Sequence, residues 1–165
     1  MPTELPSDRA VSPVLGVVLL LVVTAVLAGT VGTVALGTSM PTDSPRAAID
    51  LRVDAEENRV TLVHRGGDQL DVAALSVRVS IDGTPLDAQP PVPFFSAAGF
   101  EPGPTGPFNS AADRRWTAGE TASFALAGTN DPAISSGATV TVVLSTDSAV
   151  VAEVEGAPAP ERGMA

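Results

Sequence analysis

The most compact group of residues able to do chemistry is the run His64-Arg65-Gly66-Gly67-Asp68. A histidine near an aspartate can serve a hydrolase, but the triad also needs a serine or cysteine nucleophile. The chain has no cysteine, and no serine stands in the context of a nucleophile elbow. Two glycines after a strand supply the backbone freedom of a turn. We therefore interpret this run as a structural turn and expect no catalytic residue and no enzyme.

Two groups of carboxylates could hold a hard cation, namely Asp54-Glu56-Glu57 and Asp68 with Asp71. Calcium needs several oxygens that converge on one point, and no twelve-residue calcium loop is present. The single histidine excludes a zinc site built from several histidines. No glycine-rich phosphate loop occurs either. We expect a solvated acidic surface, with no metal and no cofactor.

Aromatic residues are concentrated in one irregular stretch of the chain. Five of the six lie between residues 94 and 116, namely Phe94, Phe95, Phe100, Phe108 and Trp116. One interpretation is that this loop folds back and seals the hydrophobic core. The other is that its rings form an exposed surface for adhesion or for contacts between subunits.

The charge balance is strongly acidic. The 165 residues include 19 Asp and Glu against 9 basic residues, all of them arginine, which gives a net charge of −10. Such a surface would be repelled by a nucleic-acid backbone, so nucleic acid is excluded as a partner. An acidic chain without lysine is typical of proteins that work in high salt, where self-repulsion is screened. A GC-rich genome would bias the composition in the same direction.

One long apolar element precedes all of these residues. Residues 12–36 carry no charge and match the ~20 residues that a helix needs to cross a bilayer. Ser12 is a suitable N-cap, Pro13 suits the first turn, and Gly37 followed by Pro41 ends the pattern. The segment could be a permanent transmembrane anchor. It is long for a secretory signal, although a cut near Ala28 is conceivable.

Small residues recur along this predicted helix at a spacing of four. One row contains Ala25, Gly29 and Thr33, and the other contains Gly16, Ala28 and Gly32. Small residues at this spacing let helix backbones approach closely. They are also common in any membrane helix, so the rows indicate helix packing without proving it.

The rest of the chain shows the period-two alternation of half-buried strands. The first pair is centred on Ile49–Val53 and Val60–His64, with a turn at Glu57-Asn58, and a further strand covers Leu75–Ile81 before the turn Asp82-Gly83. Residues 84–118 are predicted to be irregular. Strands resume at 122–126, 139–145 and 149–155, with a turn at Asp147-Ser148. The predicted fold class is α+β, with an N-terminal hydrophobic helix and a small antiparallel β-sandwich-like domain.

The junction before the helix carries a family resemblance. The run Asp8-Arg9-Ala10-Val11-Ser12-Pro13-Val14-Leu15-Gly16-Val17 resembles the N-terminus of haloarchaeal type IV pilins. In that family a prepilin peptidase cuts after a basic and a small residue, which implies a processing site at Arg9, Ala10 and Val11. Many pilins of other lineages carry Glu where this chain has Leu15. A His-x-Gly-Gly-Asp run also recurs in the β-domains of similar proteins.

The resemblance implies a domain plan and a function. Residues 1–10 would be a cleaved leader, 11–37 a transmembrane and filament-core helix, 38–46 a stalk, 47–156 an extracellular β-domain and 157–165 a disordered tail. The protein would be a membrane precursor and then a subunit of a homo-oligomeric surface filament used in adhesion. Its partners would be sister pilins, the peptidase and the pilus assembly machinery. The alternative is a single-pass membrane-anchored binding protein that does not polymerise.

Overall fold

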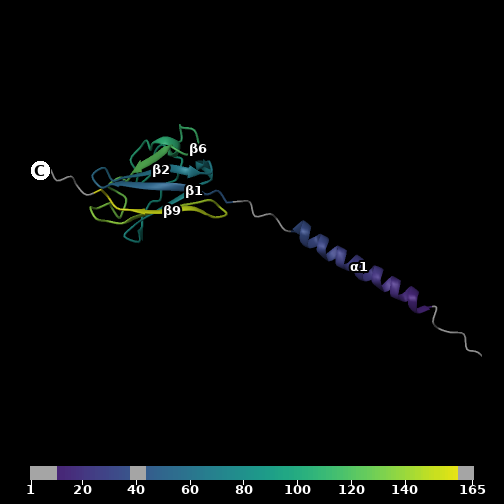
Figure 1. Cartoon of the computed structure of the whole chain (residues 1–165). Helices are drawn as coiled ribbons and strands as arrows, with labels where there is room; N and C mark the ends of the chain where they lie inside the picture. The colour runs from purple at the N-terminus through teal and green to yellow at the C-terminus, as the bar shows by residue number, and fades with distance from the viewer. Residues whose placement is uncertain (1–10, 38–43, 160–165) are drawn as a thin grey trace, which may run out of the picture. The chain divides into compact units, whose positions relative to one another are not determined.

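The computed structural model describes residues 11–37 and 44–159, and within the helix the side chains of residues 13–28 (Figure 1). The chain divides into two compact units, residues 1–42 and 43–165. The predicted leader, most of the predicted stalk and the last part of the predicted tail lie outside the described residues.

The first unit contains one long helix. Helix α1 spans Val11–Gly37 and is 27 residues long. It ends at the predicted glycine but begins one residue before Ser12, so the predicted N-cap lies inside the helix. Helix boundaries commonly shift by one or two residues, because the first turn makes few hydrogen bonds of its own.

The second unit begins with a three-stranded antiparallel sheet in the order β1-β2-β7. Strand β1 is Ala47–Asp54, β2 is Arg59–Gly67 and β7 is Thr121–Ala125. The alternation predicted for the first two strands is confirmed, since Ile49, Val53, Val60 and Leu62 are buried. A bulge between Ala48 and Ile49 shifts the register near the start of β1.

A four-stranded antiparallel sheet follows, in the order β5-β4-β8-β9. Its strands are β4 (Ser76–Ile81), β5 (Thr84–Pro85), β8 (Val140–Ser145) and β9 (Val150–Gly156). The predicted turn at Asp82-Gly83 is confirmed, because both residues have the positive φ, 51° and 79°, that a two-residue hairpin requires. The turn at Asp147-Ser148 is closed by a hydrogen bond from Thr146 N to Ala149 O of 2.8 Å.

The connecting segment 84–118 is mainly irregular, as predicted, but it contains short elements. Strand β6 (Arg115–Trp116) pairs with β3 (Leu70–Asp71). Two 3-10 turns, η2 (Val72–Ala74) and η3 (Gly106–Phe108), flank these strands in the sequence. Elements of two or three residues are too short to show a hydrophobic period, so the sequence did not predict them.

One hydrophobic core joins the sheets of this second unit. It includes Val60, Leu62 and Phe124 from the first sheet and Val142 and Leu144 from the second. Leu51 of β1 also lies beside Gly156 of β9. One helix with mainly antiparallel sheets agrees with the predicted α+β class, while the sandwich arrangement stays a prediction.

Candidate functional site

Helix α1 is the first candidate site, because its apolar side chains have no cover in the described part of the chain. The large side chains between Val14 and Leu27 are 47–68% exposed. The one polar side chain in this stretch, Thr24, donates from Oγ1 to Leu20 O at 2.8 Å, so its hydroxyl is satisfied within the helix. All the side chains of residues 13–28 are therefore exposed in the described structure, and the large ones are hydrophobic.

The structure describes the side chains of some residues in the two predicted packing rows and not of others. Gly16, Ala25 and Ala28 lie on α1 and are open, and a Cβ at Gly16 would meet nothing within 4 Å. Gly29, Gly32 and Thr33 lie on the same helix, but their side chains are outside the described set. At the processing junction, Val11 is the first residue of α1, while Arg9 and Ala10 are outside the described residues.

Within the part of the chain that the structure describes, no helix meets the combined length and apolarity needed to qualify as a membrane span.

The His64–Asp68 run ends strand β2 and lies against the start of β1. His64 is fully buried and its Nε2 lies 2.9 Å from Asp68 O. A carbonyl can only accept, so Nε2 is the donor in this contact. Nδ1 has no hydrogen-bond partner among the described residues. The expectation that this run forms a turn was wrong. His64–Gly67 continue strand β2, and Gly66 and Gly67 pair with the start of β1.

The loop aromatics form a continuous series of ring contacts with the core. His64, Trp116, Phe108, Phe124, Phe100 and Phe94 follow one another, with centroid distances of 5.3–6.2 Å between neighbours. Phe94, Phe100, Phe108 and Trp116 are buried, which confirms that the loop seals the core. Phe95 is 61% exposed. Of the five side chains in the predicted contact loop, Phe95 is the one on the surface. The contact role of the loop stays a prediction.

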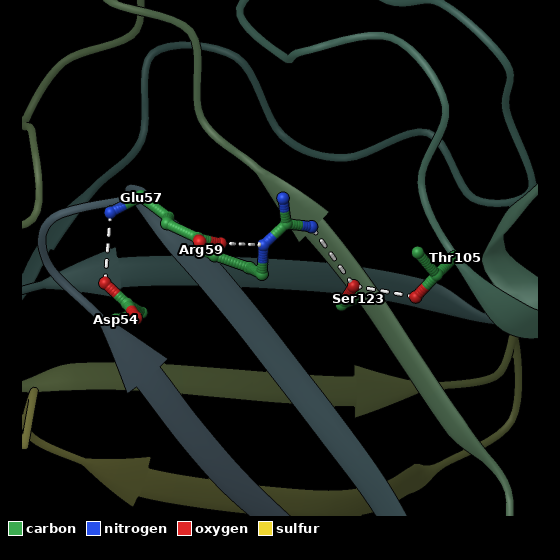
Figure 2. A network of polar contacts seen from close by, with 5 residues as sticks. All are labelled: Asp54, Glu57, Arg59, Thr105 and Ser123. Atoms are coloured by element: carbon green, nitrogen blue, oxygen red, sulfur yellow. Dashed lines mark hydrogen bonds and ion pairs between the residues drawn. The ribbon is translucent and has the colours of Figure 1, made fainter.

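A polar network fastens the same loop to the first sheet (Figure 2). Arg59 joins the side chain of Glu57 at 2.8 Å and reaches Ser123 Oγ at 3.5 Å, and Ser123 Oγ lies 2.7 Å from Thr105 Oγ1. Thr105 also pairs with Ser123 through main-chain hydrogen bonds, so it extends the sheet beyond β7. The side chain of Arg59 is 36% exposed and that of Glu57 is 62% exposed, so solvent screens their ion pair, which contributes only about 0–1 kcal/mol. The network therefore holds the loop against the first sheet.

Three carboxylates of the possible calcium groups accept hydrogen bonds from main-chain N–H groups. Asp54 accepts from Glu57 N at 3.0 Å, Asp68 from Arg46 N at 2.9 Å and Asp71 from Ala73 N at 3.0 Å. No group of three or more potential metal ligands occurs among the residues described. Elsewhere, the main-chain N–H of Arg115, and then its guanidinium, lower the pKa of Asp113 below its ordinary value.

Two structural polar residues were missed by the sequence reasoning. Gln89 accepts from Val79 N and donates to Val79 O, at 2.7 and 3.0 Å, so its amide replaces a neighbouring strand. Asn130 is 2% exposed and bonds both the N–H and the C=O of Ala88. Neither residue stands in a periodic pattern, so nothing in the sequence separated it from ordinary loop residues. A groove of about 200 Å³, lined by residues 75–78 and 90–92, contains none of the predicted site residues.

Comparison with known proteins shows what the N-terminal part of the chain is similar to. Residues 9–49 match the family model described as archaeal type IV pilin, N-terminal. The matched region covers Arg9, Ala10, all of α1 and the first residues of β1. Residues 9–49 are therefore similar to the N-terminal region of archaeal type IV pilins, and the resemblance read from residues 8–17 is confirmed at that level.

A curated relative extends the likeness. An uncharacterized protein of Archaeoglobus fulgidus is 32% identical over 75 residues, which are 44% of this chain and 53% of that protein. The chain thus spans about half the length of the relative that it matches.

Proposed function

We propose that this protein is a structural, non-enzymatic subunit of an archaeal type IV pilus-like surface filament. The observation that carries the proposal is the pilin N-terminal match over residues 9–49, within which an uncharged helix begins at Val11. In a filament, the exposed apolar surface of α1 would be covered by sister helices. Identical subunits that add through such a non-closing contact can extend without limit.

We further propose the life history of the subunit. The precursor is held in the cell membrane by residues 11–37, with 1–10 as a leader that a prepilin peptidase removes between Ala10 and Val11. The pilus machinery then transfers the mature chain into the filament. This plan is supported by the absence of charge in residues 12–36, which suits a bilayer first and a dry filament core later.

The second unit is proposed to face the surroundings and to set the properties of the filament surface, adhesion included. Residues 38–46 would link it to the helix, residues 47–156 would form a β-sandwich-like domain, and 157–165 would be its tail. Because the chain has 19 acidic residues and no lysine, we propose that it works in high salt, as haloarchaeal pilins do.

The mature N-terminus is the decisive measurement. Intact-mass or N-terminal analysis of the protein taken from the cell surface should give Val11 as the first residue. A variant with Arg9→Glu should accumulate in the membrane with its leader attached, while Arg46→Glu, which changes charge equally but lies after the helix, should be processed normally. Retention of Met1, or a cut near Ala28, would contradict the pilin proposal and favour a plain anchor or a secretory signal.

A further inference from the structure

The point where the chain enters its β unit is built more firmly than an ordinary strand end. Arg46 immediately precedes β1, and β1 lies at the edge of the sheet order β1-β2-β7. Among the described strands, β1 forms its ladder with β2 alone. A pull on the chain from the helix side would therefore act first at the Ala47–Gly67 pair, where β1 could peel away from β2.

Asp68 closes this end with two hydrogen bonds to one residue. Asp68 N donates to Arg46 O at 2.8 Å, and Arg46 N donates to Asp68 Oδ2 at 2.9 Å. This exchange extends the antiparallel ladder by one pair beyond Ala47–Gly67. The side-chain carboxylate takes the position at which a regular pair would use the main-chain carbonyl. The bond to a carboxylate is also stronger than its neutral counterpart.

The carbonyl of Asp68 is thereby left for the core. His64 Nε2 donates to it at 2.9 Å, and His64 is fully buried with its ring edge-on to Trp116. The main chain of His64 is held as well, since its N–H donates to Glu120 O and its C=O accepts from Gly119 N. Through His64, the Asp68 contacts connect the start of β1 to buried residues of the unit and not only to a surface loop.

We propose that Asp68 is a clamp that keeps the N-terminal end of β1 paired with β2 when the chain is pulled from its helix. Asp68 acts in this clamp through its hydrogen bonds with Arg46 and His64. The proposed function enters only as the source of the pull, because a subunit or an anchored protein held by α1 transmits every external load through Arg46.

Cleavage by trypsin after Arg46 measures the opening of this end directly. Arg46 is exposed, but its carbonyl is held by Asp68, so cleavage requires β1 to open there. When opening is fast relative to cleavage, the rate follows the population of the open form. Full-length protein in detergent is digested, and the fragment that begins at Ala47 is followed by mass.

Asp68→Ala should raise the rate of cleavage after Arg46 about tenfold or more, the size expected when a hydrogen bond to a charged group is lost. Asp68→Asn, which keeps an oxygen acceptor without the charge, should give a smaller increase. Asp71→Ala is the matched control, because it removes a similar carboxylate contact, to Ala73 N at 3.0 Å, away from Arg46. Its rate after Arg46 should stay within about twofold of the parent, since most surface changes have small effects.

Equal cleavage of the parent and Asp68→Ala would overturn the clamp, and so would an equal increase in Asp71→Ala. A parallel rise after Arg59 and Arg78 would show that the whole unit opens and would also count against it. None of these cleavage rates depends on filament formation. The clamp proposal can therefore be wrong while the proposed function is right, and the proposed function can be wrong while the clamp proposal is right.

Discussion

Gly67 shows how the absence of a single side chain permits the approach of β1 to β2. Its φ of 100° disfavours other residues, and a Cβ there would lie 2.3 Å from Arg46 O. Gly83 has a similar φ of 79° but open space around it in the described structure. A substitution at Gly83 therefore introduces backbone strain alone, whereas one at Gly67 introduces backbone strain and a steric conflict.

We predict that Gly67→Ala destabilises the unit more than Gly83→Ala does. The Gly83 change should cost about 1–2 kcal/mol, the usual penalty of a left-handed conformation with a Cβ. The Gly67 change adds the displacement of Arg46 and should cost at least about 1 kcal/mol more, a typical price of local strain. Urea unfolding followed by circular dichroism measures both values. Equal losses would mean that β1 shifts freely and that the close approach has no consequence.

The sequence predicted single residues well where a simple physical rule applied. The positive-φ turn at Asp82-Gly83 was predicted because turns need backbone freedom. The turn expected at Gly66-Gly67 was wrong, because both glycines lie in β2 and pair with β1, and of the two Gly67 alone has a positive φ. The burial of His64 was suggested only by its place in the alternation with Val60 and Leu62. Its link to Asp68 O, and the role of Asp68 at Arg46, could not be predicted, because they join residues whose contact depends on the register of two strands.

At the scale of elements, helix α1 and the loop that seals the core make separate predictions. For the helix, Gly29→Leu adds bulk in the row with Ala25 and Thr33 but keeps the segment apolar. We expect insertion and leader removal to proceed while filaments fail to form, because close helix approach needs small residues. Val26→Leu, at a position already large and 59% exposed, is the control and should assemble. Electron microscopy of surface filaments and immunoblots of processed chain give the readout.

Two adjacent residues test how the loop contributes to stability. Phe94→Ala should cost about 3–5 kcal/mol, because it removes a buried ring that contacts Phe100 at 5.6 Å. Phe95→Ala should stay within about 0.5 kcal/mol, because this ring is 61% exposed. Thermal melts distinguish the pair. If Phe95→Ala leaves the melt unchanged but weakens surface attachment or subunit contact, the contact role of the loop is supported. If attachment and subunit contact are also unchanged, the contact role of Phe95 is contradicted.

Elements were predictable in proportion to their length. The strands with five or more residues were located because alternation over that length is a clear signal. Their ends lie within about two residues of the prediction except in β2, which continues to Gly67, beyond the predicted end at His64. Strands β3, β5 and β6 and the two 3-10 turns escaped, because two or three residues carry no period. The sequence left the fate of the aromatic loop open, and only the packing against Phe124 decides that four of its rings lie inside.

At the scale of the whole molecule, net charge is the property with the clearest consequence. We predict that residues 38–165 form a soluble, mainly β domain whose melting temperature falls when salt is lowered from 1 M to 0.01 M. Over that range the screening length grows from ~3 to ~30 Å, so acidic repulsion is unmasked. Replacing Asp54, Glu56 and Glu57 by their amides should reduce this dependence. A dominant helical spectrum would contradict the fold, and an unchanged melting temperature would contradict the electrostatic argument.

Trp116 gives this protein a built-in optical probe. It is the single tryptophan in a chain without tyrosine, and it is fully buried against Phe108 and His64. Ultraviolet excitation at the red edge therefore reports on one indole, which lies between His64 and Phe108 in the series of rings that joins the loop to the core. Its emission should lie at short wavelength in the folded chain and move to longer wavelength when water reaches the ring. The folding state of the β unit can thus be read in the purified full-length chain, in detergent or in lipid, without attaching a dye.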